Sequence, residues 1–297
     1  MKTIFHIGVH KTATTHIQDT FELHLKDLKD RNIRYLPRDL LREKGNKFIS
    51  CISIFDRFVF FRSQIVERKM RSIFSRLTAP ADACVLISEE NLIGSSRDLL
   101  GRILYPDMEM NLRAIRAMIK HEDYMFYIAI RNFRNIIPSA YSQMARGGKV
   151  RPGMMEKISA DILAEGRTWK DFIVRLFSVI PSDRVRIYQY EDYFDHASEI
   201  LPAIAGLKSG DIDFENIHAP ASTKSLSAET LAAIESIPRW KTKAHRSRLA
   251  EALSENDVGT KKFRPFSAEV EAILDKNYES DLKWIKKNYS QTMIVFE

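Results

Sequence analysis

The sequence is poor in cysteine and has no long hydrophobic run. Only Cys51 and Cys84 are present among its 297 residues, and they can form neither a disulfide framework nor a metal site of recognisable spacing. No apolar run approaches the roughly 18 residues of a membrane-spanning helix. The short apolar run at the N-terminus also lacks the form of a signal peptide. We therefore expect a cytoplasmic protein with no transmembrane segment.

Long linkers, repeats and low-complexity stretches are absent as well, which predicts a single domain over residues 1–297. Strand-like apolar runs alternate with helical patterns, as in a three-layer α/β/α fold with a central parallel sheet. We predict strands at Thr3–Val9, Ile33–Leu36, Ala83–Ser88, Met125–Ile130 and Arg184–Tyr190. We predict helices at Thr14–Lys29, Asn135–Ala145, Ala197–Ala205, Ala228–Ser236 and Ala268–Lys276. Helical insertions are expected near residues 40–80 and 147–180.

The first eighteen residues contain the strongest functional signal. They predict a buried strand up to Ile7, a sharp turn at Gly8, and a helix that begins near Thr14. Free N–H groups, hydroxyls and a lysine at a helix N-terminus suit a phosphate or sulfate group. A Walker A loop would require glycine at the position of Ala13 and lysine at that of Thr14. The only lysine of this loop is Lys11, three residues before that position. Its position argues against an ordinary ATP- or GTP-hydrolysing site and favours a relative of the P-loop that handles a different nucleotide. The alternative is an ordinary turn with threonine caps.

The stretch H-I-G-V-H-K-T-A-T-T resembles the 5′-phosphosulfate-binding loop of the sulfotransferases. Those enzymes use 3′-phosphoadenosine 5′-phosphosulfate as sulfuryl donor, and their loop lysine precedes a small residue and a Thr-Thr or Ser-Thr pair. The resemblance implies a P-loop-like nucleotide-binding fold of the bacterial sulfotransferase type. It assigns the donor-binding loop to Lys11, Thr12, Ala13, Thr14 and Thr15. The family often has glycine in place of Ala13.

A second segment, Y-I-A-I-R-N-F-R-N-I-I-P-S-A-Y, resembles the 3′-phosphate site of the same family. Arg131, Ser139 and Tyr141 match its R-x7-S-x-Y pattern, so the resemblance implies that Arg131 and Ser139 bind the 3′-phosphate. A guanidinium can make two parallel hydrogen bonds to phosphate, and a hydroxyl adds another donor. The family commonly has proline where this chain has Phe133. An arginine in this place also pairs commonly with a carboxylate or a helix C-terminus, which is the alternative interpretation.

Two later segments carry a weaker resemblance. I-Y-Q-Y-E-D-Y-F-D resembles a family strand that ends in Tyr-Glu-Asp, and the helical sequence from Phe266 onward resembles the closing helices of bacterial members. A basic loop precedes those helices in the family and touches the 3′-phosphate. The resemblance places Lys261 or Lys262 in that role here.

Polar residues follow the predicted strands, and ligands of open parallel sheets bind beyond the carboxyl ends of the strands. Sulfuryl transfer resembles phosphoryl transfer, so positioning and charge stabilisation dominate, and no metal is required. Lys11 is predicted to stabilise charge on the leaving oxygen. The acceptor needs a base, for which we rank Glu89 first, Glu90 second and His10 third. The alternative is a structural role in which Ser88 caps a short helix. His6, within the first strand, is expected to be a satisfied core histidine.

The formal charge of +7 and the pI near 9.3 indicate anionic partners. The basic residues lack a nucleic-acid-binding pattern, so a nucleotide or an anionic acceptor explains the charge equally well.

The aromatic stretch F-I-S-C-I-S-I-F-D-R-F-V-F-F either lines an acceptor pocket or packs on the sheet. We predict sulfuryl transfer to a hydroxyl or amine of a small-molecule, lipid or carbohydrate acceptor. The alternatives are a kinase with a modified P-loop and a non-catalytic module that binds nucleotide or polyanion.

Overall fold

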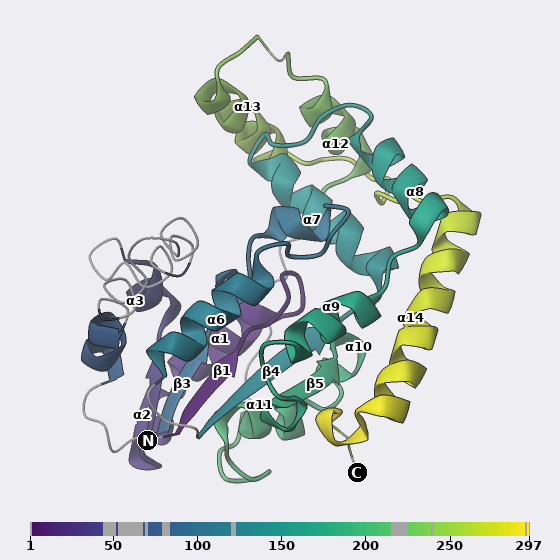
Figure 1. Ribbon diagram of the computed structural model, residues 1–297. Coiled ribbons are helices and arrows are strands. Elements are labelled where there is room, and N and C mark those ends of the chain that lie inside the picture. The colour runs from purple at the N-terminus through teal and green to yellow at the C-terminus, as the bar shows by residue number, and fades with distance from the viewer. Residues whose placement is uncertain are drawn as a thin grey trace.

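A five-stranded sheet of parallel strands lies at the centre of the protein (Figure 1). The computed structural model describes residues 2–43, 52, 68, 71–78, 84–119, 123–214, 225–238, 240–294 and 296. Along the sheet the order is β2–β3–β1–β4–β5. The strands are β1 (Thr3–His6), β2 (Ile33–Leu36), β3 (Cys84–Ser88), β4 (Tyr124–Ile130) and β5 (Val185–Gln189). All five predicted strands are therefore present, within a few residues of their predicted ends.

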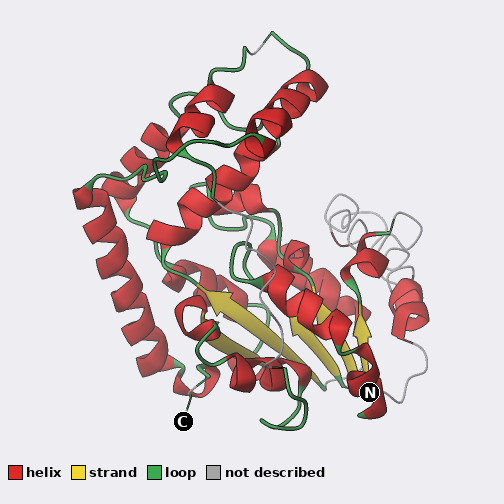
Figure 2. Ribbon diagram, turned by 180° about the vertical axis from the view of Figure 1, so that it is seen from behind, coloured by secondary structure: helices red, strands yellow, loops and turns green. Residues whose placement is uncertain are grey.

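Helices cover both faces of this sheet (Figures 1 and 2). The helices are α1 (Thr14–Leu23), α2 (Leu25–Asp30), α3 (Arg38–Arg42), α6 (Met108–Met118), α7 (Phe133–Arg146), α8 (Met154–Glu165), α9 (Trp169–Phe177), α10 (Tyr190–Tyr193), α11 (Ala197–Ala205), α12 (Ala228–Glu235), α13 (Lys243–Glu255) and α14 (Ala268–Asn288). Short 3-10 helices span Glu90–Leu92, Ser96–Leu99, Ser182–Arg184 and Ser290–Thr292.

The two faces of the sheet belong to two separate hydrophobic clusters. Ile4 of β1 packs with α1, α2 and α11 on one side, whereas Phe5 of the same strand packs with α6, α7 and α9 on the other. All four residues of β1 are buried, as expected for a parallel strand covered on both faces. The predicted three-layer α/β/α fold with a central parallel sheet is confirmed.

Two predicted helices have the wrong length. The helix predicted over Thr14–Lys29 is divided at His24, whose backbone leaves the helical region at φ −101° and ψ 24°. The Nδ1 atom of His24 pairs with Asp27 at 2.8 Å and so stabilises the start of the second helix, α2. The helix predicted to end at Lys276 continues to Asn288, because no glycine or proline follows to end it.

The expected helical insertions are described in part. The insertion near 147–180 contains α8 and α9, and α8 extends with α12 and α13 away from the sheet (Figure 2). Of the insertion near 40–80, the described residues are helical at the end of α3, at 52, at 68 and at 71–78. Most of the aromatic stretch and Cys51 lie outside the described residues, while Cys84 is a free thiol. None of the described helices is long and apolar enough to cross a membrane.

The free energy of unfolding should depend on pH through His6. Its imidazole is fully buried, with Ser88 Oγ at 2.8 Å from Nδ1 and the Tyr188 hydroxyl at 2.9 Å from Nε2, which confirms the predicted core histidine. Burial lowers the pKa of His6 from 6.5 to about 3. Below pH 6.5 the unfolded chain therefore binds a proton that the folded chain does not.

We expect the free energy of unfolding to decrease by about 1.4 kcal/mol per pH unit through this histidine as the pH falls below its unfolded pKa. Urea denaturation at about pH 7 and about pH 5 measures the difference, and His6→Gln should reduce it by roughly 2 kcal/mol. The exposed His245 provides the matched control, because His245→Gln should leave the difference unchanged. An equal pH response in the wild type and His6→Gln would show that this side chain is not responsible.

Candidate functional site

The loop between β1 and α1 lies where ligands of such sheets bind. β1 has β3 on one side and β4 on the other, so the strand order reverses at β1. The carboxyl end of a strand at such a reversal is the usual ligand position in open α/β sheets. The residues that follow β1 therefore lie where a ligand is expected to bind.

The backbone of this loop presents N–H groups to an anion. Lys11 and Ala13 both adopt left-handed conformations, with φ of 70° and 61°, on either side of Thr12. Such alternation turns successive N–H groups toward one side, which is the geometry of an anion-binding nest. Within the described residues, the N–H groups of residues 13–16 have no hydrogen-bond acceptor. Left-handed conformations cost non-glycine residues about 1–2 kcal/mol each, and such strain is found most often at functional sites.

Gly8 has a different role from the one expected. Its φ is not left-handed, so the turn does not need its conformational freedom. It is required for close approach instead, since a Cβ atom here would lie 2.4 Å from Thr14 Oγ1 and 3.0 Å from the His6 ring. Gly8 thus brings the start of α1 against the end of β1.

The three threonines of the loop have three different environments. The Thr12 hydroxyl donates to the Val9 carbonyl at 2.5 Å and closes the turn. Thr14 is buried, and its Oγ1 atom has no hydrogen-bond partner among the described residues. Thr15 is exposed at the first turn of α1. Thr14 therefore has an unused buried hydroxyl directly at the predicted anion site.

Arg131 lies next to the loop between β1 and α1. Its Nη1 atom donates to the Lys11 carbonyl at 2.6 Å, and its guanidinium stacks 3.9 Å above the centre of the Tyr190 ring. The Nε atom is buried and lacks a partner among the described residues. Burial lowers the pKa of Arg131, while Tyr190 and Glu191 oppose this effect. No carboxylate forms an ion pair with Arg131 in the part of the chain described, which speaks against the alternative role for this residue.

The Lys11 ammonium lies in a field of several charges. Burial lowers its pKa, the Glu90 carboxylate raises it, and the cations of Arg131 and Arg146 lower it further. Glu90 is half-buried, and its closest cationic contact is Arg42 at 4.0 Å. Lys11 itself makes no ion pair with a described residue. Arg146, at the C-terminal end of α7, was not identified from the sequence.

Glu89 is fully buried, and its carboxylate is occupied by hydrogen bonds. Nε and Nη2 of Arg42 donate to it at 2.8 Å each. The backbone N–H and the side-chain amide of Asn91 donate to it at 2.9 and 2.6 Å. Three of these four donors bind Oε1, while Oε2 accepts from Nε of Arg42 alone. The structural alternative for this segment thus receives support, although the cap is Glu89 and not Ser88, whose hydroxyl pairs with His6.

His10 is held in a chain of hydrogen bonds that the sequence did not reveal. The backbone N–H of His10 donates to the Tyr105 hydroxyl oxygen at 3.1 Å, and the ring atom Nδ1 lies 2.9 Å from the same oxygen. The Asn91 amide nitrogen donates to Glu89, so its Oδ1 faces Nε2 of His10 at 3.4 Å and accepts a hydrogen bond from it. Nδ1 then accepts a hydrogen bond from the Tyr105 hydroxyl. The chain continues through Glu89 to Arg42, and it fixes His10 at the entrance of the loop.

The other predicted nucleotide contacts lie along α7 and beside it. Ser139 is half-buried on α7, without a hydrogen-bond partner among the described residues. Tyr141 donates to Glu235 of α12, and the Phe263 ring stacks on it with centroids 5.7 Å apart. The exposed Lys261 and Lys262 immediately precede Phe263. This basic loop therefore contacts α7 two residues from Ser139.

Arg134, the second arginine of this segment, serves the fold. It pairs with Glu271 at 2.7 Å and Asp275 at 2.8 Å on α14. These contacts tie the start of α7 to the long C-terminal helix. They leave Arg131 as the arginine directed toward the loop.

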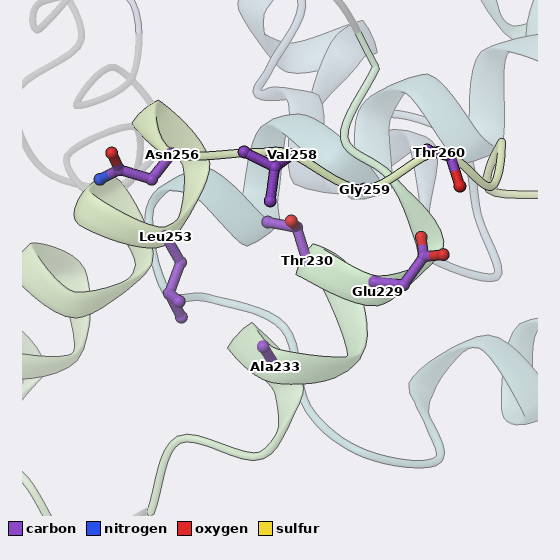
Figure 3. A pocket seen from close by; sticks show the side chains of 8 residues that line it. All are labelled: Glu229, Thr230, Ala233, Leu253, Asn256, Val258, Gly259 and Thr260. Carbon is purple, nitrogen blue, oxygen red and sulfur yellow. The ribbon is translucent and has the colours of Figure 1, made fainter.

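A pocket of about 460 Å³ lies between α12, α13 and the loop that follows α13 (Figure 3). Its lining consists of Glu229, Thr230, Ala233, Leu253, Asn256, Val258, Gly259 and Thr260. None of the predicted site residues lines it, and it offers no cation to an anionic ligand. The described residues contain no cluster of histidine, cysteine and carboxylate side chains that could hold a metal ion.

No protein-family model matches the chain, and no curated protein matches it either. Among solved structures, the fold is similar to that of a sulfotransferase from Alicyclobacillus acidocaldarius, with 14% sequence identity. The match covers 85% of this chain and 96% of the other, with a TM-score of 0.43. At this identity and TM-score the similarity says nothing about function, so the residues of the site have to carry the functional assignment.

Proposed function

We propose that the protein is a sulfotransferase that moves a sulfuryl group from 3′-phosphoadenosine 5′-phosphosulfate to a hydroxyl or amine of a small-molecule, lipid or carbohydrate acceptor. One observation supports this most directly: Arg131 donates to the carbonyl of Lys11, 120 residues away, at 2.6 Å. This contact places the two elements that we predict to bind phosphate next to each other. A donor that carries phosphate at both its 5′ and 3′ positions has an anionic group for each of them.

The residues of the loop fit such a donor. The free N–H groups of residues 13–16 and the unused hydroxyl of Thr14 would hold the 5′-phosphosulfate. Arg131, with its unpartnered Nε, would bind the 3′-phosphate together with Ser139 and with Lys261 or Lys262. In this assignment Lys11 neutralises the charge that develops on the leaving oxygen. Burial makes its ammonium a stronger proton donor, because the pKa of Lys11 is lowered.

The geometry favours Glu90 as the base among the three candidates. Glu89 already accepts four hydrogen bonds and has no accessible surface. The Nδ1 atom of His10 accepts from Tyr105, so its lone pair is also engaged. Glu90 is partly exposed, and its carboxylate influences the pKa of Lys11. It would take the proton of the acceptor hydroxyl as the new oxygen–sulfur bond forms.

A thermal-shift comparison of three nucleotides tests this proposal. We expect 3′-phosphoadenosine 5′-phosphate to raise the melting temperature without added metal, and to do so more than ADP or ATP with magnesium. The reason is that only the first ligand carries the 3′-phosphate that Arg131 would bind, and a ligand that binds the folded state alone stabilises it. Equal or greater stabilisation by ATP with magnesium would contradict the proposal and favour a kinase.

Transfer of labelled sulfate to a library of acceptors then separates an enzyme from a binding module. Stabilisation by 3′-phosphoadenosine 5′-phosphate without transfer to any hydroxyl or amine would support a non-catalytic nucleotide-binding module. Arg131→Ala serves as the internal control of the thermal-shift experiment. It should reduce the preference for the 3′-phosphorylated ligand over ADP.

A further inference from the structure

The helices α12 and α13 lie at the end of the molecule opposite the two chain termini (Figure 1). Here the loop between α7 and α8 packs directly on α13: a Cβ atom on Gly148 would lie 2.9 Å from the carbonyl of Arg246. The contact joins two basic segments, which we call the basic tip. The basic tip consists of Lys149, Arg151, Trp240, Lys241, Lys243, Arg246 and Arg248.

The basic tip has no acidic residue within its own segments. Residues 147–153 contain two basic residues and residues 240–250 contain four lysines and arginines, and neither segment contains aspartate or glutamate. The basic tip thus carries six positive charges, against a net charge of +7 for the whole chain. Elsewhere arginines such as Arg42, Arg134 and Arg175 are paired with carboxylates. By contrast, Lys149, Lys243 and Arg248 form no ion pair with any described residue.

The basic tip contains one large apolar side chain, and it is exposed. Trp240 is 82% exposed, and its described ring contact is with the ammonium of Lys241, 4.6 Å from the ring centre. The other two tryptophans are better covered, since Trp169 is fully buried and Trp284 is half-buried. An exposed indole beside a lysine is typical of the boundary between a membrane and water.

We infer that the basic tip docks the protein on a membrane surface that contains anionic lipids. Clustered lysines and arginines are attracted to the negative potential of such a surface, and the indole of Trp240 would enter the headgroup layer. The shape favours a membrane over a soluble polyanion, because α12 and α13 project from the body and can meet a flat surface (Figure 2). A polyanion would use the charges but would leave the exposed indole without a function. This inference does not depend on the proposed sulfuryl transfer.

Vesicle sedimentation with the full chain tests the inference. We expect binding to vesicles of phosphatidylcholine mixed with phosphatidylglycerol, weaker binding at high salt, and no binding to phosphatidylcholine alone. The double variant Lys241→Glu with Lys243→Glu should bind about thirtyfold or more weakly. The matched control is Lys283→Glu with Lys286→Glu on the exposed side of α14, which makes the same change in net charge. The control should retain most of the binding.

Tryptophan fluorescence tests the role of the indole separately. The emission should shift to shorter wavelength when phosphatidylglycerol vesicles are added, and the shift should be absent in Trp240→Ala. Failure to prefer anionic vesicles, or an equal loss in the α14 control, would overturn the inference. So would binding of soluble dextran sulfate as tight as that of the vesicles and unaffected by Trp240→Ala, because the basic tip would then be a polyanion site.

Discussion

Replacement of Lys11 by alanine is expected to lower the rate of sulfuryl transfer by about 10²–10³, while the affinity for 3′-phosphoadenosine 5′-phosphate changes by no more than about threefold. The leaving group gains negative charge only as the bond to sulfur breaks, so its stabilisation belongs to the transition state. The bound nucleotide still has the N–H groups of residues 13–16 and Arg131 as partners. The loss should therefore appear in kcat and not in binding.

Single-turnover transfer assays and isothermal titration with 3′-phosphoadenosine 5′-phosphate measure the two quantities. Lys26→Ala on the surface of α2 is the matched control, and it should change neither. Lys11→Arg should recover part of the rate because it keeps the positive charge. If Lys11→Ala lost binding and transfer to the same extent, Lys11 would be a ground-state binding residue and the proposed role would be wrong.

Glu89→Gln and Glu90→Gln are expected to have opposite effects on stability and transfer. Glu89→Gln removes the negative charge of a fully buried carboxylate that accepts two hydrogen bonds from Arg42. Because Arg42 is 39% exposed, water can solvate the guanidinium that is left unpaired, and the free energy of unfolding should decrease by about 1–3 kcal/mol. Glu90→Gln should cost less than about 1 kcal/mol, since this side chain has only a 4.0 Å contact with Arg42. It should abolish transfer, because the acceptor would lose its base.

Urea denaturation and sulfate transfer, measured on the same samples, separate these roles. A double variant, Arg42→Gln with Glu89→Gln, should recover part of the lost stability because neither charge remains. Full transfer activity in Glu90→Gln, together with its loss in a folded Glu89→Gln, would return the role of base to Glu89. That result would show that the four hydrogen bonds of Glu89 are rearranged when the acceptor binds.

The strands could be predicted from the sequence because their signals are local. Ile33–Leu36 and the other apolar runs are short, bounded by polar or turn residues, and buried on both faces. The ends of helices were harder to predict, because they depend on single residues. His24 interrupts a continuous amphipathic pattern, and the residues after Lys276 continue one that was expected to stop. Neither event changes the hydrophobic periodicity on which the prediction depended.

The candidate site was predictable in its residue types but not in its contacts. The position of Lys11 before a small residue and two threonines is a feature of the sequence, and so is Arg131 at the end of a strand. The left-handed backbone at Ala13 gave no signal, because alanine rarely adopts this conformation. Tyr105 could not be connected to His10 either, since 95 residues separate two side chains that meet at 2.9 Å.

The amino-acid sequence by itself determined the succession of strands and helices along the chain and the excess of positive charge. It also determined the lysine position that distinguishes the first loop from a Walker A loop. These properties depend on neighbouring residues and on composition. Only the tertiary structure decided that Arg131 contacts Lys11, that Glu89 is held by Arg42, and that the basic segments before α8 and at α13 form one surface. Each of these contacts joins elements distant in the chain, and packing of helices on both faces of the sheet brings them together.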